Sequence, residues 1–137
     1  MKVHFKRTVM AYAVKSPILG FEDTKEVALE EIDLLFTSMK DINNENISFT
    51  LVNPFLLRKY DFEISDEIKE LLSISDDSKI SVYNILLIQK PLEKSLINFL
   101  APLIVNHDSK EIAQIILDPK KYPDYGMTET IDSYKEA

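Results

Sequence analysis

Two apolar blocks separated by a proline constrain the fold of this chain more than any other feature. They are SVYNILLIQK (residues 81–90) and SLINFLAPLIVN (residues 95–106), and charged side chains are nearly absent from both. Apolar runs of this length, bounded by turn residues, are typical of strands inside a sheet or barrel. Pro91 and Pro102 cannot donate a hydrogen bond to a neighbouring strand, so we expect the strands to end or bend there. The two blocks therefore predict a buried β core with the acidic remainder of the chain at its surface.

The other expected strands alternate apolar with polar side chains, as half-buried strands do. They cover residues 11–15, 25–32, 34–40, 47–53, 60–64 and 111–118. Residues 25–32 also fit a helical spacing, but their alternation favours a strand. The turn-forming residues 41–46 and 106–110 predict two hairpins. Seven or eight short strands of this kind indicate a mainly β, predominantly antiparallel sandwich or barrel.

One or two short helices complete the expected fold. Ser65 is a good N-cap, because its side chain can accept a hydrogen bond from the first helical turn. Asp66 and Glu67 follow in that turn, where the helix dipole favours anions. A second short helix is expected over residues 128–134, whereas residues 119–126 (PKKYPDYG) cannot be regular structure.

The length of 137 residues suits a single domain, here residues 10–137. Residues 1–9 (MKVHFKRTV) are basic and lack the apolar core of a secretory signal, so they are interpreted as an N-terminal extension without an assigned function. Met10 is then an alternative start. No apolar run reaches the roughly 18 residues of a membrane helix, and no membrane association is expected. The absence of cysteine excludes disulfides and fits a reducing cytoplasm.

The formal net charge is −7, and it becomes −10 when Lys2, Lys6 and Arg7 of the basic segment are set aside. A domain this acidic repels a phosphate backbone, so direct nucleic-acid binding is not expected. The charge fits a basic protein partner. Without other evidence, a solvated surface that only keeps the protein soluble is the favoured interpretation.

The chemistry-bearing residues give no catalytic motif. The only histidines are His4 and His107, and His107 lies in an expected turn, where a solvent-exposed ring is more common than a catalytic one. The two glycines form neither a P-loop nor a dinucleotide fingerprint, and no serine lies in a nucleophile elbow. We therefore expect no catalytic, cofactor or metal site.

Carboxylates are the one abundant chemical group. They form two clusters, Glu22, Asp23, Glu26, Glu30, Glu31 and Asp33 in the first, and Asp61, Glu63, Asp66, Glu67, Glu70, Asp76 and Asp77 in the second. A glycosidase would need a carboxylate pair in a cleft with sugar-stacking aromatics, and the chain has no tryptophan. Both clusters are interpreted as solvated faces, and a small carboxylate-dependent hydrolase is kept as the less favoured alternative.

Five segments, in order and in register, resemble one known family. They are SPILGFED (16–23), FTLVNPFLLRKYDFEIS (49–65), NFLAPLIVN (98–106), AQIILD (113–118) and YPDYG (122–126). Together they resemble the flagellar assembly factor FliW, in particular the epsilonproteobacterial type, over about residues 11 to 134. The resemblance implies a small antiparallel β-barrel-like domain and a non-enzymatic, cytoplasmic regulator, expected to be a monomer.

The resemblance also implies two protein partners. Proteins similar to FliW bind the RNA-binding translational repressor CsrA and relieve its repression of flagellin mRNA. They also bind flagellin, so that free flagellin sequesters the factor and flagellin synthesis stops. A flagellin-specific chaperone without a CsrA partner is the alternative within the same family resemblance.

The expected contact residues combine a turn with part of the second acidic cluster. They are Asn53, Pro54, Phe55, Asp61, Glu63, Asp66 and Glu67. An aromatic side chain beside charged residues is a usual composition for a protein interface. The alternative is equally compatible with the sequence: Phe55 belongs to the core and Asn53 only forms a turn.

Overall fold

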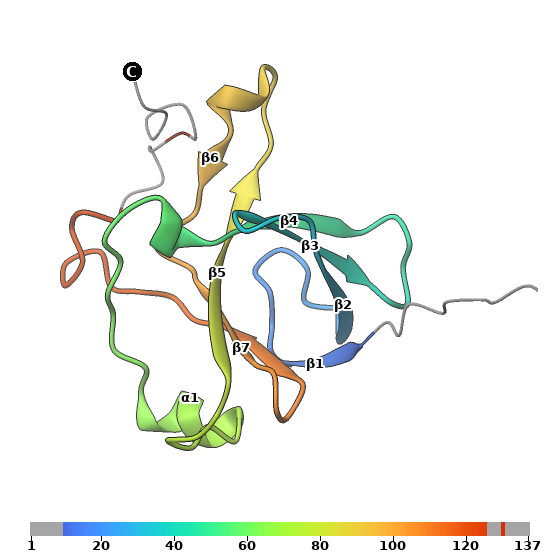
Figure 1. The fold of residues 1–137 in the computed structure, drawn as a ribbon, viewed down its shortest axis with the longest axis vertical. Helices are drawn as coiled ribbons and strands as arrows, with labels where there is room; N and C mark the ends of the chain where they lie inside the picture. The colour runs from blue at the N-terminus through green and yellow to red at the C-terminus, as the bar shows by residue number, and fades with distance from the viewer. Residues whose placement is uncertain (1–9, 126–129, 131–137) are drawn as a thin grey trace, which may run out of the picture.

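The computed structural model of the protein describes residues 10–125 and residue 130 (Figure 1). Within them, seven strands close a small barrel in the order β4-β3-β2-β1-β8-β7-β5, and β5 returns to β4. An eighth short strand, β6, pairs antiparallel with the last two residues of β5. The prediction of a mainly β, barrel-like domain with a short helix is confirmed.

The strand bounds follow the alternating segments of the sequence closely. The strands are β1 (Ala11–Ser16), β2 (Glu26–Glu31), β3 (Phe36–Asp41), β4 (Ser48–Val52), β5 (Ile80–Leu87), β6 (Leu96–Ile97), β7 (Leu103–Asn106) and β8 (Glu111–Gln114). A single α-helix, α1 (Asp66–Leu71), and two 3₁₀ turns, η1 (Pro54–Leu56) and η2 (Leu92–Lys94), complete the described elements. The expected helix over residues 128–134 lies outside the described residues except for Thr130, which forms an isolated β-bridge with Leu96.

Most neighbouring strands pair antiparallel, as predicted, through hairpins at residues 41–46 and 106–110. The exception is β1, which pairs parallel with β8 and brings Val14 opposite Ile112. The first turn is also as expected, because Gly20 adopts a φ of 84°, a conformation that side chains disfavour.

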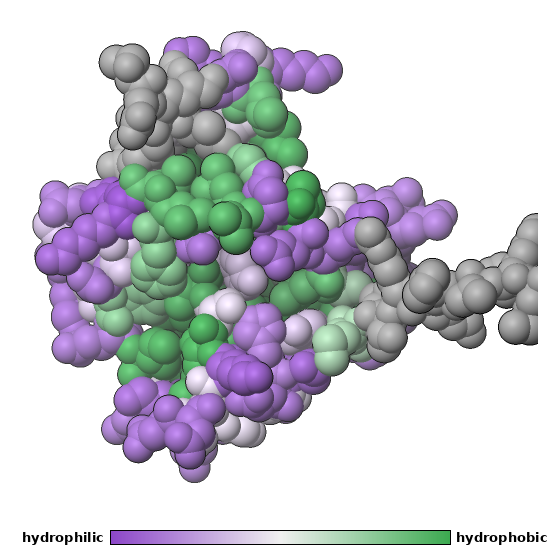
Figure 2. Space-filling view, in the orientation of Figure 1, coloured by the Kyte–Doolittle hydropathy of each residue, from purple (hydrophilic) through white to green (hydrophobic). Residues whose placement is uncertain are grey.

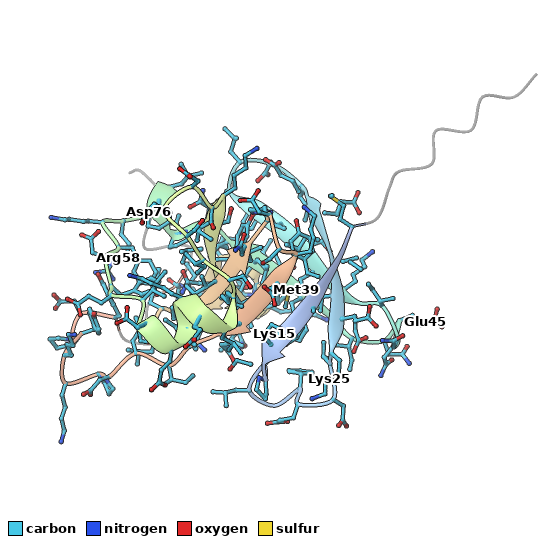
Figure 3. The ribbon with its side chains drawn as sticks, turned by 90° about the horizontal axis from the view of Figure 1, so that it is seen from below. Lys15, Lys25, Met39, Glu45, Arg58 and Asp76 are labelled. Carbon is cyan, nitrogen blue, oxygen red and sulfur yellow. The ribbon has the colours of Figure 1, made fainter. Side chains whose placement is uncertain are left out.

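The two apolar blocks supply much of the core. Ile97, Phe99, Leu103, Ile104 and Val105 are all fully buried. The second block does not form one long strand: β6 has only two residues, and β7 begins directly after Pro102. Figure 3 shows Met39 between the strands, whereas Lys25 and Glu45 lie at the periphery.

The predicted strand over residues 60–64 is wrong. The backbone amides of Asp61 and Glu63 donate to the hydroxyl oxygens of Tyr125 (2.9 Å) and Tyr122 (3.1 Å), not to a neighbouring strand. Tyr60 nevertheless points into the core. The alternation is therefore that of a half-buried extended segment. Its backbone amides bond to tyrosine hydroxyls instead of to a neighbouring strand.

The helix α1 lies at one end of the molecule, and β5 runs from beside it to the arm of η2 and β6 at the opposite end (Figure 1). No helix among the described residues is long and apolar enough to cross a membrane.

Candidate protein-binding surface

The turn after β4 is fixed by its own sequence. The Asn53 side chain accepts a hydrogen bond from the Phe55 amide (3.0 Å) and so caps η1. Pro54 occupies the first position of η1, where its restricted φ suits a helical turn. Pro54 is buried, while Phe55 is 54% exposed. The alternative that placed Phe55 in the core is therefore wrong, although Asn53 is a turn former as that alternative held.

Phe55 belongs to an apolar patch, which we define as Ile32, Leu34, Phe55 and Leu56. All four side chains are more than half exposed, and Leu34 reaches 80%. The β2–β3 turn lies beside η1 because the Asn53 amide donates to the Leu35 carbonyl (2.8 Å). Figure 2 shows hydrophobic surface gathered over the η1 region.

Three members of this patch, Ile32, Leu34 and Leu56, are not among the contact residues that the sequence predicts. The alternation predicts that Leu34 lies in a strand, but β3 begins at Phe36. The signal was present, because the runs IDLLF (32–36) and PFLL (54–57) hold more consecutive apolar residues than one buried face of a strand can accept.

The four predicted acidic contacts are all exposed, and the two on α1 lie apart from the patch. Asp61 and Glu63 sit on the extended segment between η1 and α1, and Asp66 and Glu67 occupy the first turn of α1. Figure 1 places η1 and α1 at the two ends of that segment. The structure thus divides the predicted site into an apolar part and an acidic part.

Asp61 and Glu63 flank a second segment, residues 118–125. The Glu63 carboxylate lies 3.3 Å from the Lys121 ammonium, and this hydrogen bond raises the pKa of Lys121. The Tyr125 hydroxyl donates to the Asp61 carbonyl (3.0 Å). These bonds to residues 118–125 fix the position of the segment that carries Asp61 and Glu63.

Tyr60 links the two parts to the barrel. Its ring lies 6.3 Å from that of Phe55 and 4.7 Å from that of Tyr125, measured between centroids. Its hydroxyl donates to the Phe99 carbonyl and accepts from Asn84 Nδ2 (3.1 Å). Burial raises the pKa of Tyr60 well above its usual value, so the hydroxyl stays protonated and able to donate.

His107 was expected to be solvent-exposed, but it is half-buried. Its Nδ1 lies 2.9 Å from the Tyr12 hydroxyl and its Nε2 lies 2.7 Å from Ser81 Oγ. Burial lowers the pKa of His107, and the nearby Lys110 ammonium lowers it further. Both ring nitrogens are engaged in bonds that join β1, β5 and the β7–β8 turn. This arrangement supports the fold rather than a reaction.

The described residues contain no group of three or more His, Asp or Glu side chains that could hold a metal ion. The carboxylates of both clusters are exposed along the surface. The chemistry that this surface offers is protein contact: an exposed apolar patch on a rigid turn, with acidic side chains along the adjoining segment.

Comparison with known proteins gives a consistent family match. A family model described as FliW protein matches residues 2–130. Flagellar assembly factor FliW 2 of Wolinella succinogenes is 49% identical over 125 residues, covering 91% of this chain and 92% of the relative. The flagellar assembly factors FliW of Sulfurimonas denitrificans and Campylobacter lari are 48% and 41% identical, each aligned with 91% of this chain and with 98% and 96% of the relative.

A solved structure supports the fold. The crystal structure of a flagellar assembly factor FliW matches with a TM-score of 0.80, covering 99% of this chain and 92% of that one. The sequence identity in this comparison is 23%, so the likeness concerns the fold.

Proposed function

This chain belongs to the FliW protein family, and from that premise we propose that it is a flagellar assembly factor that works by binding other proteins. The observation that carries the proposal is the family match over residues 2–130, together with relatives of 41 to 49% identity along nine-tenths of the chain. These relatives are named as assembly factors and not as enzymes.

The finer form of the proposal is a partner switch in the cytoplasm. The protein binds the repressor CsrA and relieves repression of flagellin mRNA, and free flagellin competes for the factor. A net charge of −7 supports this, because an RNA-binding partner must present a basic surface. Complementary charge accelerates association and selects partners.

The apolar patch is the proposed anchor for one partner. Buried aromatic and aliphatic side chains at the centre of an interface carry most of its binding energy, and flanking charges steer the encounter. The Asn53 cap fixes the backbone at Phe55, so little backbone freedom is lost on binding. Asp66 and Glu67 supply the exposed negative charge.

Co-purification tests the function. The tagged protein is mixed with purified CsrA and with purified flagellin from a flagellated relative such as Campylobacter lari. Capture of both partners supports the switch. Capture of flagellin alone favours the chaperone alternative, and capture of neither contradicts both forms of the proposal.

Two variants test the surface. Phe55→Asp is expected to weaken binding of one partner about 30-fold or more, the effect of losing a hot-spot residue. Leu92→Asp is the matched control, because Leu92 on η2 is 56% exposed and lies outside the patch. Equal loss in the two variants, with both proteins folded, excludes the patch.

The acidic part is tested by Asp66→Lys combined with Glu67→Lys. We expect slower association with CsrA and a shallower dependence of the rate on salt, since rim charges act mainly on the association rate. Unchanged rate and unchanged salt dependence remove α1 from the interface.

A further inference from the structure

The barrel closes through a short seam between β4 and β5. Within residues 10–125, these strands share only two residue pairs, Leu51–Ile85 and Val52–Asn84. β4 nevertheless begins at Ser48 and pairs with β3 along its whole length. β5 continues beyond Ile85 and pairs there with β6. The two strands therefore diverge on one side of the seam.

The register of β4 shows which of its backbone groups face away from β3. The Asp41 amide donates to the Ile47 carbonyl (3.1 Å) at one end of the pairing. The Asn53 amide donates to the Leu35 carbonyl (2.8 Å) at the other end. Because hydrogen-bonded and non-bonded positions alternate along an antiparallel pair, Ser48 directs its amide and carbonyl groups to the opposite edge. No strand among the described residues pairs with Ser48 there, and an edge of this kind can accept an extended peptide.

An apolar groove of about 310 Å³ lies where the strands diverge. Its lining includes Leu19, Phe21, Phe49, Leu87 and Ile88, and none of the described residues that line it carries a charge. The rings of Phe21 and Phe49 pack edge to face with their centroids 4.7 Å apart. Leu19 and Ile88 are more than half exposed. A volume near the lower limit of ligand pockets suits a few side chains of a peptide better than a large cofactor.

The rim of the groove is mostly acidic. Among the exposed residues that the structure describes within three positions of a lining residue along the chain, Glu22, Asp23 and Glu45 are acidic and only Lys90 is basic. The Glu22 carboxylate is held in the turn after β1, where it accepts from the Gly20 amide (3.1 Å). A second copy of the chain would bring a net charge of −7 to this rim, and repulsion opposes that occupant. The charges favour a cationic occupant.

We propose that this groove binds an extended, positively charged segment of another protein as a strand added to β4. The backbone of the segment bonds to Ser48, and its apolar side chains at alternate positions enter the groove. The intervening basic side chains point to the opposite face, as they do in any strand. Main-chain bonds then supply affinity, and the groove selects the side chains. The groove shares no lining residue with the apolar patch at Phe55, so the two surfaces can be altered separately.

Fluorescence anisotropy with the labelled synthetic peptide Lys-Val-Lys-Phe-Lys-Val-Lys and the full-length protein tests the proposal. Leu87→Asn is expected to weaken binding at least about tenfold, because it removes apolar contact at the centre of the groove. Leu71→Asn is the matched control, since Leu71 on α1 is 36% exposed and Leu87 is 37% exposed. The control should bind within about twofold of the wild type. A peptide with Glu in place of every Lys should bind at least about tenfold more weakly.

Two substitutions at Ser48 test strand addition independently of apolar contact. Ser48→Pro removes the amide donor at the open edge and no bond to β3, whereas Ser48→Ala keeps the donor. We expect Ser48→Pro to weaken peptide binding about fivefold or more and Ser48→Ala to leave it within about twofold. Urea unfolding confirms that the compared variants are folded.

Equal affinities of Leu87→Asn and Leu71→Asn for the peptide overturn the proposal. An equal loss in Phe55→Ala and Leu87→Asn also overturns it, because the peptide then binds at the apolar patch. Absence of saturable binding, or equal binding of the glutamate peptide, has the same consequence. If the free protein forms a dimer that Leu87→Asn dissociates, the occupant is a second copy and not a cationic segment. None of these outcomes alters the co-purification test, which uses other binding partners.

Discussion

Single polar groups determine how the surface of this protein is held on its core. Tyr60 is the main example, because its ring contacts the exposed Phe55 while its hydroxyl bonds the Phe99 carbonyl and Asn84 inside the barrel. A buried hydrogen bond contributes only modestly to the free energy of unfolding. Its loss costs more, because it leaves a buried donor or acceptor that neither protein nor water can bond.

Tyr60→Phe is therefore expected to lower the free energy of unfolding by about 1–3 kcal/mol, the cost of buried partners left unpaired. Tyr122→Phe is the control, because its hydroxyl bonds the Glu63 amide at an exposed site and its loss should cost less than about 1 kcal/mol. Urea unfolding of both variants measures the difference. Similar losses in the two would contradict the role assigned to the Tyr60 hydroxyl.

His107 predicts a dependence of stability on pH. The unfolded chain binds a proton at His107 near pH 6.5, whereas burial and Lys110 lower the pKa of the folded state, and Asp108 opposes this only in part. The unfolded state thus binds more protons in this range, so stability is complete above about pH 6.5 and falls as the pH drops through the lowered folded pKa.

We expect the free energy of unfolding to fall more between pH 7 and pH 5 in the wild type than in His107→Gln. His4 and the carboxylates are common to both proteins, so the difference isolates His107. Parallel pH profiles from urea unfolding would show that the histidine does not resist protonation in the fold.

At the scale of elements, capping and side-chain hydroxyls fix the conformation of the chain between β4 and α1. Asn53 caps η1, Ser65 caps α1 by accepting from the Ile68 amide (3.3 Å), and two tyrosine hydroxyls accept from the amides of the segment between them. The caps are local and could be predicted from sequence. The tyrosines lie about 60 residues further along the chain and could not.

Ser65→Ala should destabilise the protein by about 1 kcal/mol, the usual cost of a lost N-cap. Ser65→Asp should retain most of the stability, because Asp also caps and its charge suits the helix dipole. Thermal unfolding compares the two variants. A loss of the same size in Ser65→Asp would mean that the serine acts through something other than the cap.

At the scale of the whole molecule, closure of the barrel determines which residues of the same type are buried and which are exposed. Phe99 is fully buried between strands, whereas Phe55 is more than half exposed on η1. The local sequence is similar around the two phenylalanines, since each lies in an apolar run next to turn residues. Their different burial follows only from closure of the barrel.

Phe99→Ala is expected to lower the free energy of unfolding by about 3–5 kcal/mol, through lost burial and the cavity left behind. Phe55→Ala should change it by about 0.5 kcal/mol or less, as for most exposed positions, while weakening partner binding. Unfolding and co-purification assays on the same two proteins measure both effects. A stable Phe99→Ala variant would contradict the position of Phe99 in the core.

The local features of this protein can be predicted from its amino-acid sequence. Alternation predicted most strands, including the ambiguous residues 25–32, and Gly20, Ser65 and the hairpin loops followed from short-range chemistry. The buried blocks, the family resemblance and the turn at Asn53 were also visible in the sequence. These features depend on neighbours a few residues apart, which a linear sequence records directly.

Features that depend on long-range contacts are visible only in the folded barrel. It turned residues 60–64 from a predicted strand into a segment bonded by distant tyrosines, and it engaged His107 between Tyr12 and Ser81. It also separated Asp66 from Phe55 and gathered Ile32 and Leu34 beside η1. The physical reason is that closing the barrel joins segments up to about a hundred residues apart, and no local pattern specifies which side chains then share a surface.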